Sequence, residues 1–525
     1  MQILALNDFH GNLLPPAGSS GRVGTINAGG VEYLATHINN LRALNPNTVV
    51  VSAGDMIGAS PLLSALFHDE PTIEAFNLIG LDYNAVGNHE FDEGWHELQR
   101  MQEGGCHPVD GCLDGDDFAG ATFQFLAANV VRQDNGMTIF PAYKTRSFAG
   151  AKIAFIGMTL EGTPLIVTPS GISDLNFLDE ADTVNALVPE LQSKGIETIV
   201  VLIHEGGMQS APAPFNGCTG ISGPILDIVN RLDDEVDVVI SGHTHQPYNC
   251  VIDGKIVTSA FSFGRLVTKI DLSIDRATGE VVTMTANNLI VTRDVPPASP
   301  LTALIAKYNA IAAPLANRVI GSITADITRT NNAAGESALG DVIADGQLDA
   351  TNEPGFGDAV VAFMNPGGIR ADLTYAGSPA GEGDGNVTYG EMFTVQPFGN
   401  SLVTMTLTGA QIERLLEEQL AGCTLASARI LQVSAGFTYT WKASGGVCDK
   451  VDPTTIMLNG VMIDPLSNYR VTVNSFLADG GDSFPILTQG TDRLGGDVDT
   501  DAFEKYFATH SPVAPGPRDR ITVIP

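Results

Sequence analysis

Polar side chains of metal-ligand type recur in the first half of the chain, directly after short apolar runs. The densest group is the segment 87–92 (GNHEFD), which follows the run 83–86 and brings together an amide, an imidazole and two carboxylates. Side chains this polar rarely crowd at the end of a buried strand unless they hold a charged group, because burying them without a partner is costly. We therefore expect an ion-binding site at this strand end.

The same arrangement follows four other predicted strands. The residues concerned are Asp8 and His10 after residues 3–6, Asp55 after 49–51, His204 after 199–203, and His243 and His245 after 236–240. Imidazole nitrogens and carboxylate oxygens suit zinc, manganese and similar ions. A single DxH or HxH pair is weak evidence, but five of the ten histidines fall at such strand ends. The set indicates a dinuclear metal site in which one carboxylate is shared by both ions.

The remaining histidines have no such setting. We interpret them as surface or core residues: His37, His68, His96, His107 and His510.

Short apolar strands alternate with helical stretches over residues 1–293, which predicts a layered α/β domain. The apolar runs are continuous, as expected for strands covered on both faces. Residues 31–44 carry apolar side chains at helical spacing, and residues 61–79 predict one or two further helices. Ligand sites of such sheets lie at the carboxyl ends of the strands, so this fold would gather the polar residues in one place.

The length of 525 residues exceeds what one core supports, so we expect two domains. Residues 294–300 carry three prolines, and residues 301–315 predict a helix. The expected organisation is a first domain over 1–293, a linker with a helix over 294–316, and a second domain over 317–525. A net charge of −33 disfavours a nucleic-acid polymer as partner. A phosphate ester would need bound cations to reverse that field locally.

Six cysteines are present, and nearness favours three local disulfides: Cys106–Cys112, Cys218–Cys250 and Cys423–Cys448. Such bonds imply an oxidising compartment, so we expect a secreted, periplasmic or cell-surface protein, monomeric or homodimeric. The alternative is six reduced thiols in a cytoplasmic enzyme. No apolar run is long enough to be a transmembrane segment, and the chain shows no signal peptide.

The blocks DxH, GD, GNHE, an isolated histidine after a strand, and GHTH resemble those of the calcineurin-like metallophosphoesterases. Together with the second domain, nearly the whole chain resembles the 5′-nucleotidase family. The resemblance implies a four-layer α/β/β/α metallophosphoesterase domain and a second, α+β substrate-binding domain. It also implies two divalent ions, zinc being favoured over manganese, cobalt or magnesium. One ion would be held by Asp8, His10, Asp55 and His245, and the other by Asp55, Asn88, His204 and His243, with Asp55 as the bridge.

His89 and Asp92 would form a catalytic pair in this family. Asp92 lies three residues after His89 and can hydrogen-bond the ring, which favours its protonated form. A fixed imidazolium next to the developing phosphoryl charge could contribute on the order of 10²–10⁴-fold in rate. In the alternative interpretation, Asp92 merely caps a helix that starts near residue 93.

The second domain carries three glycine-rich segments, 365–370 (NPGGIR), 396–400 (QPFGN) and 474–482 (NSFLADGGD). Gly367 and Gly368 would let the backbone approach a ligand. The resemblance assigns the remaining positions to a nucleoside pocket: Asn365 and Arg370 near base and phosphate, Phe398 and Phe476 stacking on the base, and Asp482 on the ribose. Related nucleotidases usually have further arginines at the start of this domain, but here only Arg329 is present. Whether this region binds the phosphate or carboxylate of a substrate is therefore left open.

These features imply metal-dependent hydrolysis of a nucleotide phosphate ester by a metal-bound hydroxide, releasing nucleoside and phosphate. Two ions about 3.5–4 Å apart would lower the pKa of a bound water toward neutrality. The alternatives are a 2′,3′-cyclic-nucleotide phosphodiesterase with 3′-nucleotidase activity, or a hydrolase of UDP-sugars or nucleoside di- or triphosphates. A more remote one is a surface protein that binds nucleosides without catalysis.

Overall fold

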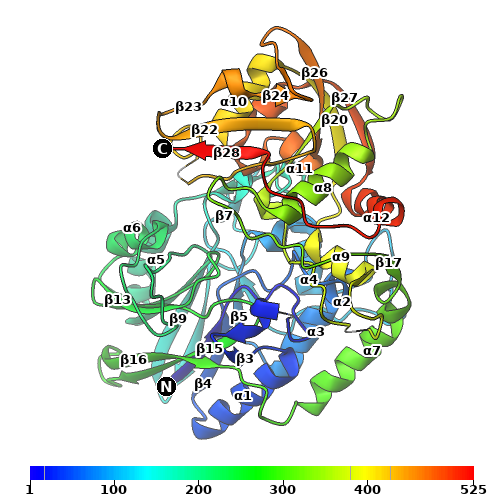
Figure 1. Cartoon of the computed structure of the whole chain (residues 1–525). Helices are drawn as coiled ribbons and strands as arrows, with labels where there is room; N and C mark the ends of the chain where they lie inside the picture. Colours follow the sequence, from blue (N-terminus) through cyan, green and yellow to red (C-terminus); the bar gives the residue numbers. More distant parts are fainter. Residues whose placement is uncertain (17, 379, 426) are drawn as a thin grey trace. The chain divides into compact units, whose positions relative to one another are not determined.

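The computed structural model describes residues 1–16, 18–378, 380–425 and 427–525, and it divides into two compact units, Met1–Ala312 and Ala313–Pro525 (Figure 1). The division falls inside one continuous helix, α7 (Ser299–Ala316), in the region where the sequence predicts a linker with a helix. Leu301, Leu304 and Tyr308 of this helix pack into the core of the first unit.

Two six-stranded sheets form the frame of the first unit. The first has the order β16-β15-β1-β4-β5-β6, with bounds Val281–Ile290, Leu266–Ile274, Gln2–Leu6, Thr48–Ser52, Tyr83–Ala85 and Gln124–Leu126. The second has the order β13-β14-β12-β11-β9-β8, with bounds Tyr248–Ile252, Lys255–Ser259, Val236–Ser241, Thr198–Ile203, Ala151–Met158 and Tyr143–Phe148. Two short pairs accompany them: β2 (Arg22–Val23) with β3 (Ile26–Asn27), and β7 (Val130–Arg132) with β10 (Leu175–Phe177).

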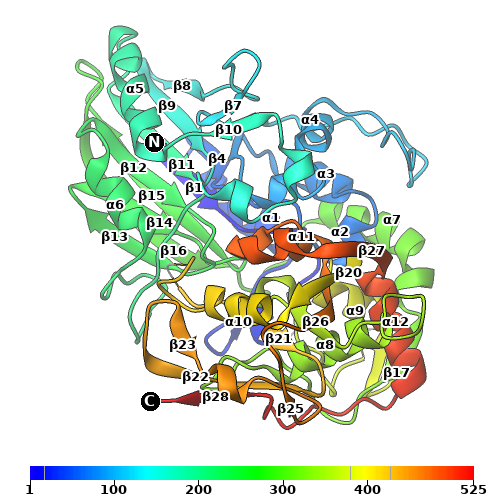
Figure 2. The same cartoon turned by 90° about the horizontal axis from the view of Figure 1, so that it is seen from above.

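Helices cover the outer faces of these two sheets, as Figure 2 shows for α5 and α6 beside β11 to β14. The helices of the unit are α1 (Val31–Leu44), α2 (Leu62–Ala65), α3 (Glu70–Ile79), α4 (Trp95–Glu103), α5 (Glu180–Ser193), α6 (Pro224–Arg231) and α7. Short 3₁₀ turns are η1 (Gly18–Gly21), η2 (His89–Phe91), η3 (Thr163–Leu165) and η4 (Pro169–Gly171).

Strand side chains alternate between two different apolar cores. In β1, Leu4 and Leu6 pack with α1 and α3, whereas Ile3 and Ala5 face residues of the second sheet. Because successive side chains of a strand point to opposite faces, a strand buried on both sides must be apolar throughout. This explains the continuous apolar runs of the sequence.

The strands that precede the polar residues run parallel to one another within each sheet. β1 pairs parallel with β4, β4 with β5, and β5 with β6. In the second sheet, β11 pairs parallel with β9 and β12. Their carboxyl ends therefore lie at a common edge of each sheet, where the ligand sites of such sheets are found.

The second unit combines mixed sheets with helices. Its main sheet has the order β21-β18-β26-β20-β27, with bounds Gln432–Val433, Val361–Met364, Asn468–Asn474, Ser401–Thr408 and Thr491–Val498. A second sheet joins β23 (Asp449–Val451), β22 (Phe437–Gly446), β24 (Met457–Leu458), β25 (Val461–Met462) and, beside β22, β28 (Ile521–Ile524); β17 (Val319–Ser322) pairs with β19 (Asn386–Thr388).

Five α-helices and four 3₁₀ turns of the described residues complete this unit. They are α8 (Ala338–Asp349), α9 (Tyr389–Val395), α10 (Gly409–Glu418), α11 (Ser475–Ala478), α12 (Asp499–His510), η5 (Pro366–Gly368), η6 (Pro453–Thr455), η7 (Gly481–Ser483) and η8 (Pro485–Gln489). Thr388 and Thr408 cap α9 and α10 with reciprocal capping boxes, which fixes where both helices begin.

The three disulfides expected from nearness, Cys106–Cys112, Cys218–Cys250 and Cys423–Cys448, are confirmed. Among the described residues, no helix combines the length and apolar character that crossing a bilayer requires.

Candidate active site

The polar residues that follow β1, β4, β5, β11 and β12 converge in the first unit. Their ligand atoms form three overlapping groups, within each of which all atoms lie within 4.8 Å of one another. The groups are Asp8, His10 and His245; His10, Asp55 and His89; and Asp55, His204 and His243. Most of these side chains are buried, and Asp55 belongs to two of the groups.

Asp55 occupies the centre of this arrangement and is almost fully buried. Its Oδ2 lies 2.9 Å from Nε2 of His204 and 3.6 Å from Nε2 of His10. Its Oδ1 accepts the backbone N–H of His89 at 2.9 Å. One carboxylate therefore faces ring nitrogens delivered by two different sheets.

Two further pairs of side chains lie near this centre, Asp8 with His245 and Asn88 with His243. Nε2 of His245 is 3.3 Å from Oδ1 of Asp8 and 3.0 Å from Nε2 of His10. Nδ1 of His243 is 3.0 Å from Oδ1 of Asn88.

Two histidine rings have their outer nitrogens fixed by backbone carbonyls. His204 Nδ1 lies 2.7 Å from the Ala53 carbonyl oxygen, and His10 Nδ1 lies 2.8 Å from that of Gly58. A carbonyl only accepts, so both Nδ1 atoms carry a hydrogen, and each Nε2 points inward, where it offers a lone pair once it carries no proton. The buried Nε2 of His204 has no hydrogen-bond partner in the part of the chain that is described, although an Asp55 oxygen is near. Lone pairs facing a carboxylate at this distance fit a cation between them.

The electrostatics of the site favour positive charge at the same place. Burial raises the pKa of Asp55, but His204, His89 and His10 outweigh that effect and hold it well below its usual value. Burial lowers the pKa of His204, and its neighbours, Asp55 foremost, reverse this and raise it to about 10. Since metal ions replace such protons on their ligands, the donor set fits divalent ions.

The backbone at the strand ends adopts a conformation that L-residues seldom take. Five of the converging residues have φ in the left-handed region: Asp8 at 50°, His10 at 48°, Asp55 at 51°, His243 at 68° and His245 at 51°. Such conformations cluster at functional sites, where the surrounding structure holds them.

Two glycines make the close approach of the loops possible. Gly54 has φ +89°, and a Cβ there would lie 2.6 Å from Nδ1 of His204. A Cβ on Gly87 would lie 2.2 Å from Oδ1 of Asp55. Any side chain at either place would displace a converging residue.

Glu90 positions the loop that carries Asp55, and this role was not expected from the sequence. Its carboxylate accepts the N–H groups of Gly87 at 2.6 Å, Asp55 at 2.9 Å and Met56 at 2.9 Å. Burial, followed by repulsion from Asp55, raises the pKa of Glu90 to about 7. Its place inside GNHE was the available signal, but the sequence does not show which backbone groups it meets.

His89 and Asp92 form the pair expected from their spacing. Nδ1 of His89 lies 2.9 Å and 3.0 Å from the two carboxylate oxygens of Asp92, and Asp92 also accepts the N–H of Ala59 at 3.0 Å. The following helix α4 begins at Trp95 after Gly94, without a side-chain cap. The alternative role of Asp92 as the cap of that helix is therefore wrong.

In the second unit, Asn365 and Asp482 lie in one buried network. Asn365 Nδ2 donates to Asp482 Oδ2 at 2.8 Å, and Asn474 Nδ2 donates to Asn365 Oδ1 at 3.0 Å. Arg429, which sequence reasoning missed, forms an ion pair with Asp482. A Cβ on Gly367 would lie 3.5 Å from Asp482 Oδ2, and one on Gly368 only 2.4 Å from Met364 Cε.

The other expected residues of that unit form separate contacts. The Arg370 guanidinium lies 5.7 Å from the centre of the Phe398 ring, within cation–π range, and Arg370 donates to the Gly367 carbonyl at 3.2 Å. Phe476 packs on Gly481, where a Cβ would be 2.4 Å from its ring. Arg329 donates to the Ile369 carbonyl at 3.2 Å, next to Arg370.

Comparison with known families matches both parts of the chain. The calcineurin-like phosphoesterase model matches residues 1–247, and the model of the 5′-nucleotidase C-terminal domain matches residues 319–489.

Curated relatives cover nearly all of the chain. It is 33% identical over 515 residues to Endonuclease YhcR of Bacillus subtilis, covering 96% of this chain but 39% of that protein. It is 31% identical over 534 residues to Cell wall protein Lmo0130 of Listeria monocytogenes, covering 97% of this chain and 67% of that protein. The chain therefore spans well under half the length of the first of these relatives.

A solved structure shares the fold over the whole length. The 5′-nucleotidase precursor from Thermus thermophilus matches with a TM-score of 0.80 at 27% identity, covering 100% of this chain and 99% of that one.

Proposed function

The chain belongs to the 5′-nucleotidase family, which joins a calcineurin-like phosphoesterase domain to a 5′-nucleotidase C-terminal domain, and from this premise we propose that it hydrolyses the phosphate ester of nucleotides to nucleoside and phosphate. The observation that carries the proposal is the position of Asp55, whose carboxylate belongs to two converging donor groups.

Two divalent cations complete the site in this proposal, because the families use divalent metal ions. Asp8, His10, Asp55 and His245 would hold one, and Asp55, Asn88, His204 and His243 the other. Zinc is favoured because each set contains two imidazole nitrogens, which zinc accepts together with carboxylate oxygens. Bound there, the ions would neutralise the phosphate and lower the pKa of a water molecule so that it can attack phosphorus.

The chain's own residues orient and stabilise the reacting group. Asp92 holds the His89 ring through Nδ1 and favours the protonated imidazole. Its positive charge would stabilise the oxygen atoms on which negative charge develops during phosphoryl transfer. The carbonyls of Ala53 and Gly58 keep His204 and His10 in the tautomer that presents Nε2 inward.

We assign nucleoside recognition to the second unit. Phe398 and Phe476 would stack on the base, which is worth roughly 1–3 kcal/mol per base. Asp482 would accept hydrogen bonds from ribose hydroxyls, and Asn365, Gly367, Gly368 and Arg370 would line the base and phosphate side. Arg329 is the candidate for a further phosphate contact. The ion pair of Asp482 with Arg429 holds that carboxylate in place for this purpose.

An extracellular location is part of the proposal. Three disulfides are typical of proteins that fold in oxidising compartments. One relative that matches nearly the whole chain is named a cell wall protein.

A substrate panel tests the proposal. Purified protein would be incubated with AMP, ADP, ATP, UDP-glucose, 2′,3′-cyclic AMP, 3′-AMP and a single-stranded oligonucleotide, and released phosphate and nucleoside would be quantified. We expect hydrolysis of AMP that EDTA abolishes and that added zinc, manganese or cobalt restores. Preference for the cyclic or 3′ substrates would favour the phosphodiesterase alternative. Full activity in metal-stripped protein, or no turnover of any substrate, would refute the proposed chemistry.

A further inference from the structure

A second cluster of metal-ligand side chains lies outside the site described above. His68, between α2 and α3, meets Glu93, Glu97 and His107, and one ligand atom from each lies within 4.8 Å of all the others. Glu97 belongs to α4, whereas His107 belongs to the loop 104–120, inside the segment that the Cys106–Cys112 disulfide closes.

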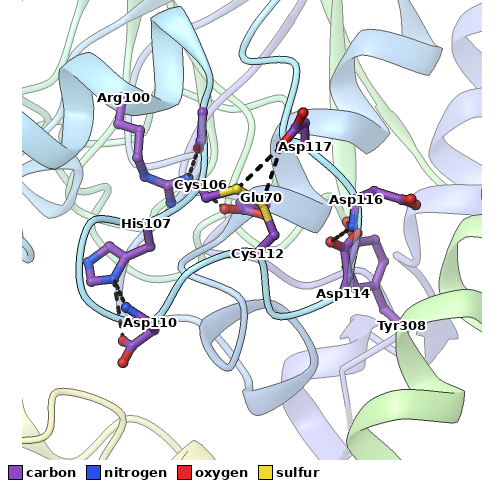
Figure 3. The surroundings of a disulfide bond; sticks show 11 residues. Glu70, Arg100, Cys106, His107, Asp110, Cys112, Asp114, Asp116, Asp117 and Tyr308 are labelled. Atoms are coloured by element: carbon purple, nitrogen blue, oxygen red, sulfur yellow. Dashed lines mark hydrogen bonds and ion pairs between the residues drawn. A yellow bond between two sulfur atoms is a disulfide. The ribbon is translucent and has the colours of Figure 1, made fainter.

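Asp110 of the same loop extends the cluster. Its Oδ2 lies 3.1 Å from Nε2 of His68. The same oxygen lies 3.4 Å from Nδ1 of His107, a contact that Figure 3 shows beside the disulfide. On its other side, His68 Nδ1 lies 2.8 Å from Oε2 of Glu93. Both histidines are largely shielded from solvent, with side-chain exposures of 16% and 15%.

The charges of the cluster do not balance without a cation. Glu93, Glu97 and Asp110 contribute three carboxylates, and Arg100, which pairs with Glu97, is shared with a fourth carboxylate, that of Glu70. His68 itself contacts two of these carboxylates, Glu93 and Asp110, so the cluster favours added positive charge. A divalent ion supplies that charge while displacing protons from its ligands.

The backbone at this point is itself unusual. His68 and Asp69 have φ of 52° and 61°, in the left-handed region. An aliphatic β-branched residue would be a marked outlier there, whereas histidine and aspartate are enriched. The turn at His68 and Asp69 places the His68 ring between α2 and α3.

We propose that His68, Glu93, Glu97 and His107, with Asp110 beside them, form a third divalent-metal site that binds a transition-type cation such as Zn²⁺. Two imidazoles and two carboxylates are a donor set that zinc accepts in tetrahedral geometry. Hard, oxygen-preferring ions such as Mg²⁺ fit the two ring nitrogens less well.

Binding requires small local movements. Ligand atoms about 2.0–2.2 Å from a tetrahedral zinc ion lie roughly 3.3–3.6 Å from one another, so the cluster contracts by about 1 Å. The rings of His68 and His107 stack at 3.8 Å with 15° between their planes, and one ring tilts because a ligating imidazole holds the metal in its own plane. Glu97 keeps its bonds to Arg100 at the same time, since an ionised carboxylate has about four acceptor positions.

The ion would fasten the loop 104–120 to α4 and to the segment before α3. That loop also contacts α7 through Lys307, whose Nζ lies 2.7 Å from Asp114. The Tyr308 hydroxyl donates to the same Asp114 carboxylate, and both residues are seen in Figure 3. The cluster also borders a recess whose wall includes His68, His89, Asp92 and Glu93. The site would thus steady the neighbourhood of the His89–Asp92 pair.

Metal stoichiometry tests the proposal without reference to catalysis. The unmodified protein, its His107→Ala variant and a second variant, His68→Gln, would be dialysed against Zn²⁺ and then analysed for bound zinc per chain. We expect each variant to hold one equivalent fewer than the unmodified protein, whatever the total number is. Equal stoichiometry in all three would overturn the proposal.

His96→Ala is the matched control, because His96 is an exposed histidine of α4 outside the cluster. It should keep the full zinc content, and loss of an equivalent there would also overturn the proposal by showing non-specific binding to surface histidines. Circular dichroism would confirm that each variant folds. Hydrogen exchange of residues 104–120 supplies a second measurement: Zn²⁺ should slow it about tenfold or more in the unmodified protein but not in His107→Ala.

Discussion

We expect turnover to depend on the hydrogen-bonded pair of His89 and Asp92. Replacing His89 by alanine removes the oriented imidazole but none of the seven residues assigned to the metals. We expect kcat for AMP to fall by about 10²–10⁴-fold with unchanged metal content. Steady-state kinetics and metal analysis of the same preparation measure both quantities. Asp92→Asn keeps an acceptor oxygen for the His89 ring but removes the charge, so its kcat should fall less than that of His89→Ala. Near-normal turnover of His89→Ala would contradict the catalytic role of His89.

Glu90 acts through the backbone that it holds rather than on the substrate. In Glu90→Gln only one oxygen remains to accept, so at least one of the three backbone N–H groups loses its partner. We expect the affinity for metal to fall about 10–100-fold, as for other residues that support metal ligands. Titration of apo protein with zinc measures this. Excess metal should restore kcat toward the unmodified value, whereas a loss of kcat at saturating metal would show a different role.

The sequence predicted residues of the site where a motif marks them, and failed where only the tertiary structure does. Asp8, Asp55 and His204 stand at strand ends that apolar runs make visible. Glu90 binds the backbone of Met56, and Arg429 pairs with Asp482; both contacts join residues far apart in the chain. The segment around Arg429 carries no recognisable motif. His68 and His107 were interpreted as surface or core residues because no local pattern connects them.

At the scale of single elements, α8 carries an unusual buried acid. Asp341 is 1% exposed, and neither of its carboxylate oxygens has a hydrogen-bond partner among the described residues. The Arg520 Nε lies 4.0 Å away, too far for a hydrogen bond. Burial raises the pKa of Asp341 to about 8, despite the opposing effect of Arg520.

This acid should make stability depend on pH. Above its unfolded pKa of 3.8, the unfolded chain releases the proton that the folded chain retains, so the free energy of unfolding falls as pH rises toward about 8. Asp341→Asn removes that loss. We expect its Tm to exceed that of the unmodified protein by about 2–4 °C or more at alkaline pH and to differ little near pH 4. Scanning calorimetry at both pH values measures the difference, and an equal shift at both would contradict the explanation.

Elements of the first unit were the easiest to predict. The helix expected over residues 31–44 is α1, because that stretch is long enough to show its helical period. The run 3–6 lies in β1, because an unbroken apolar run marks a strand buried on both faces. The second unit contains strands of two or three residues, such as β24 and β25, whose pairing is set by tertiary contacts rather than by any local pattern.

For the whole molecule, the net charge of −33 should govern encounter with an anionic substrate. Salt screens the repulsion between protein and nucleotide, so raising NaCl from about 20 mM to about 200 mM should increase kcat/KM for AMP about two- to fivefold. The change should appear in KM rather than kcat. Bis(p-nitrophenyl) phosphate carries a single negative charge and should respond less. A decrease for AMP with salt would mean that a local positive field dominates the approach.

The left-handed backbone at five converging positions also bears on how such a centre would be lost over generations. A residue with a side chain adopts this conformation at a disadvantage on the order of 1–3 kcal/mol. In a descendant without activity, substitutions to glycine or asparagine at these positions would be favoured, because both residues adopt this conformation more readily. Such substitutions would raise the stability of the fold while removing the ligand side chains. Homologues that have lost the activity should be recognisable by such replacements at positions 8, 10, 55, 243 and 245.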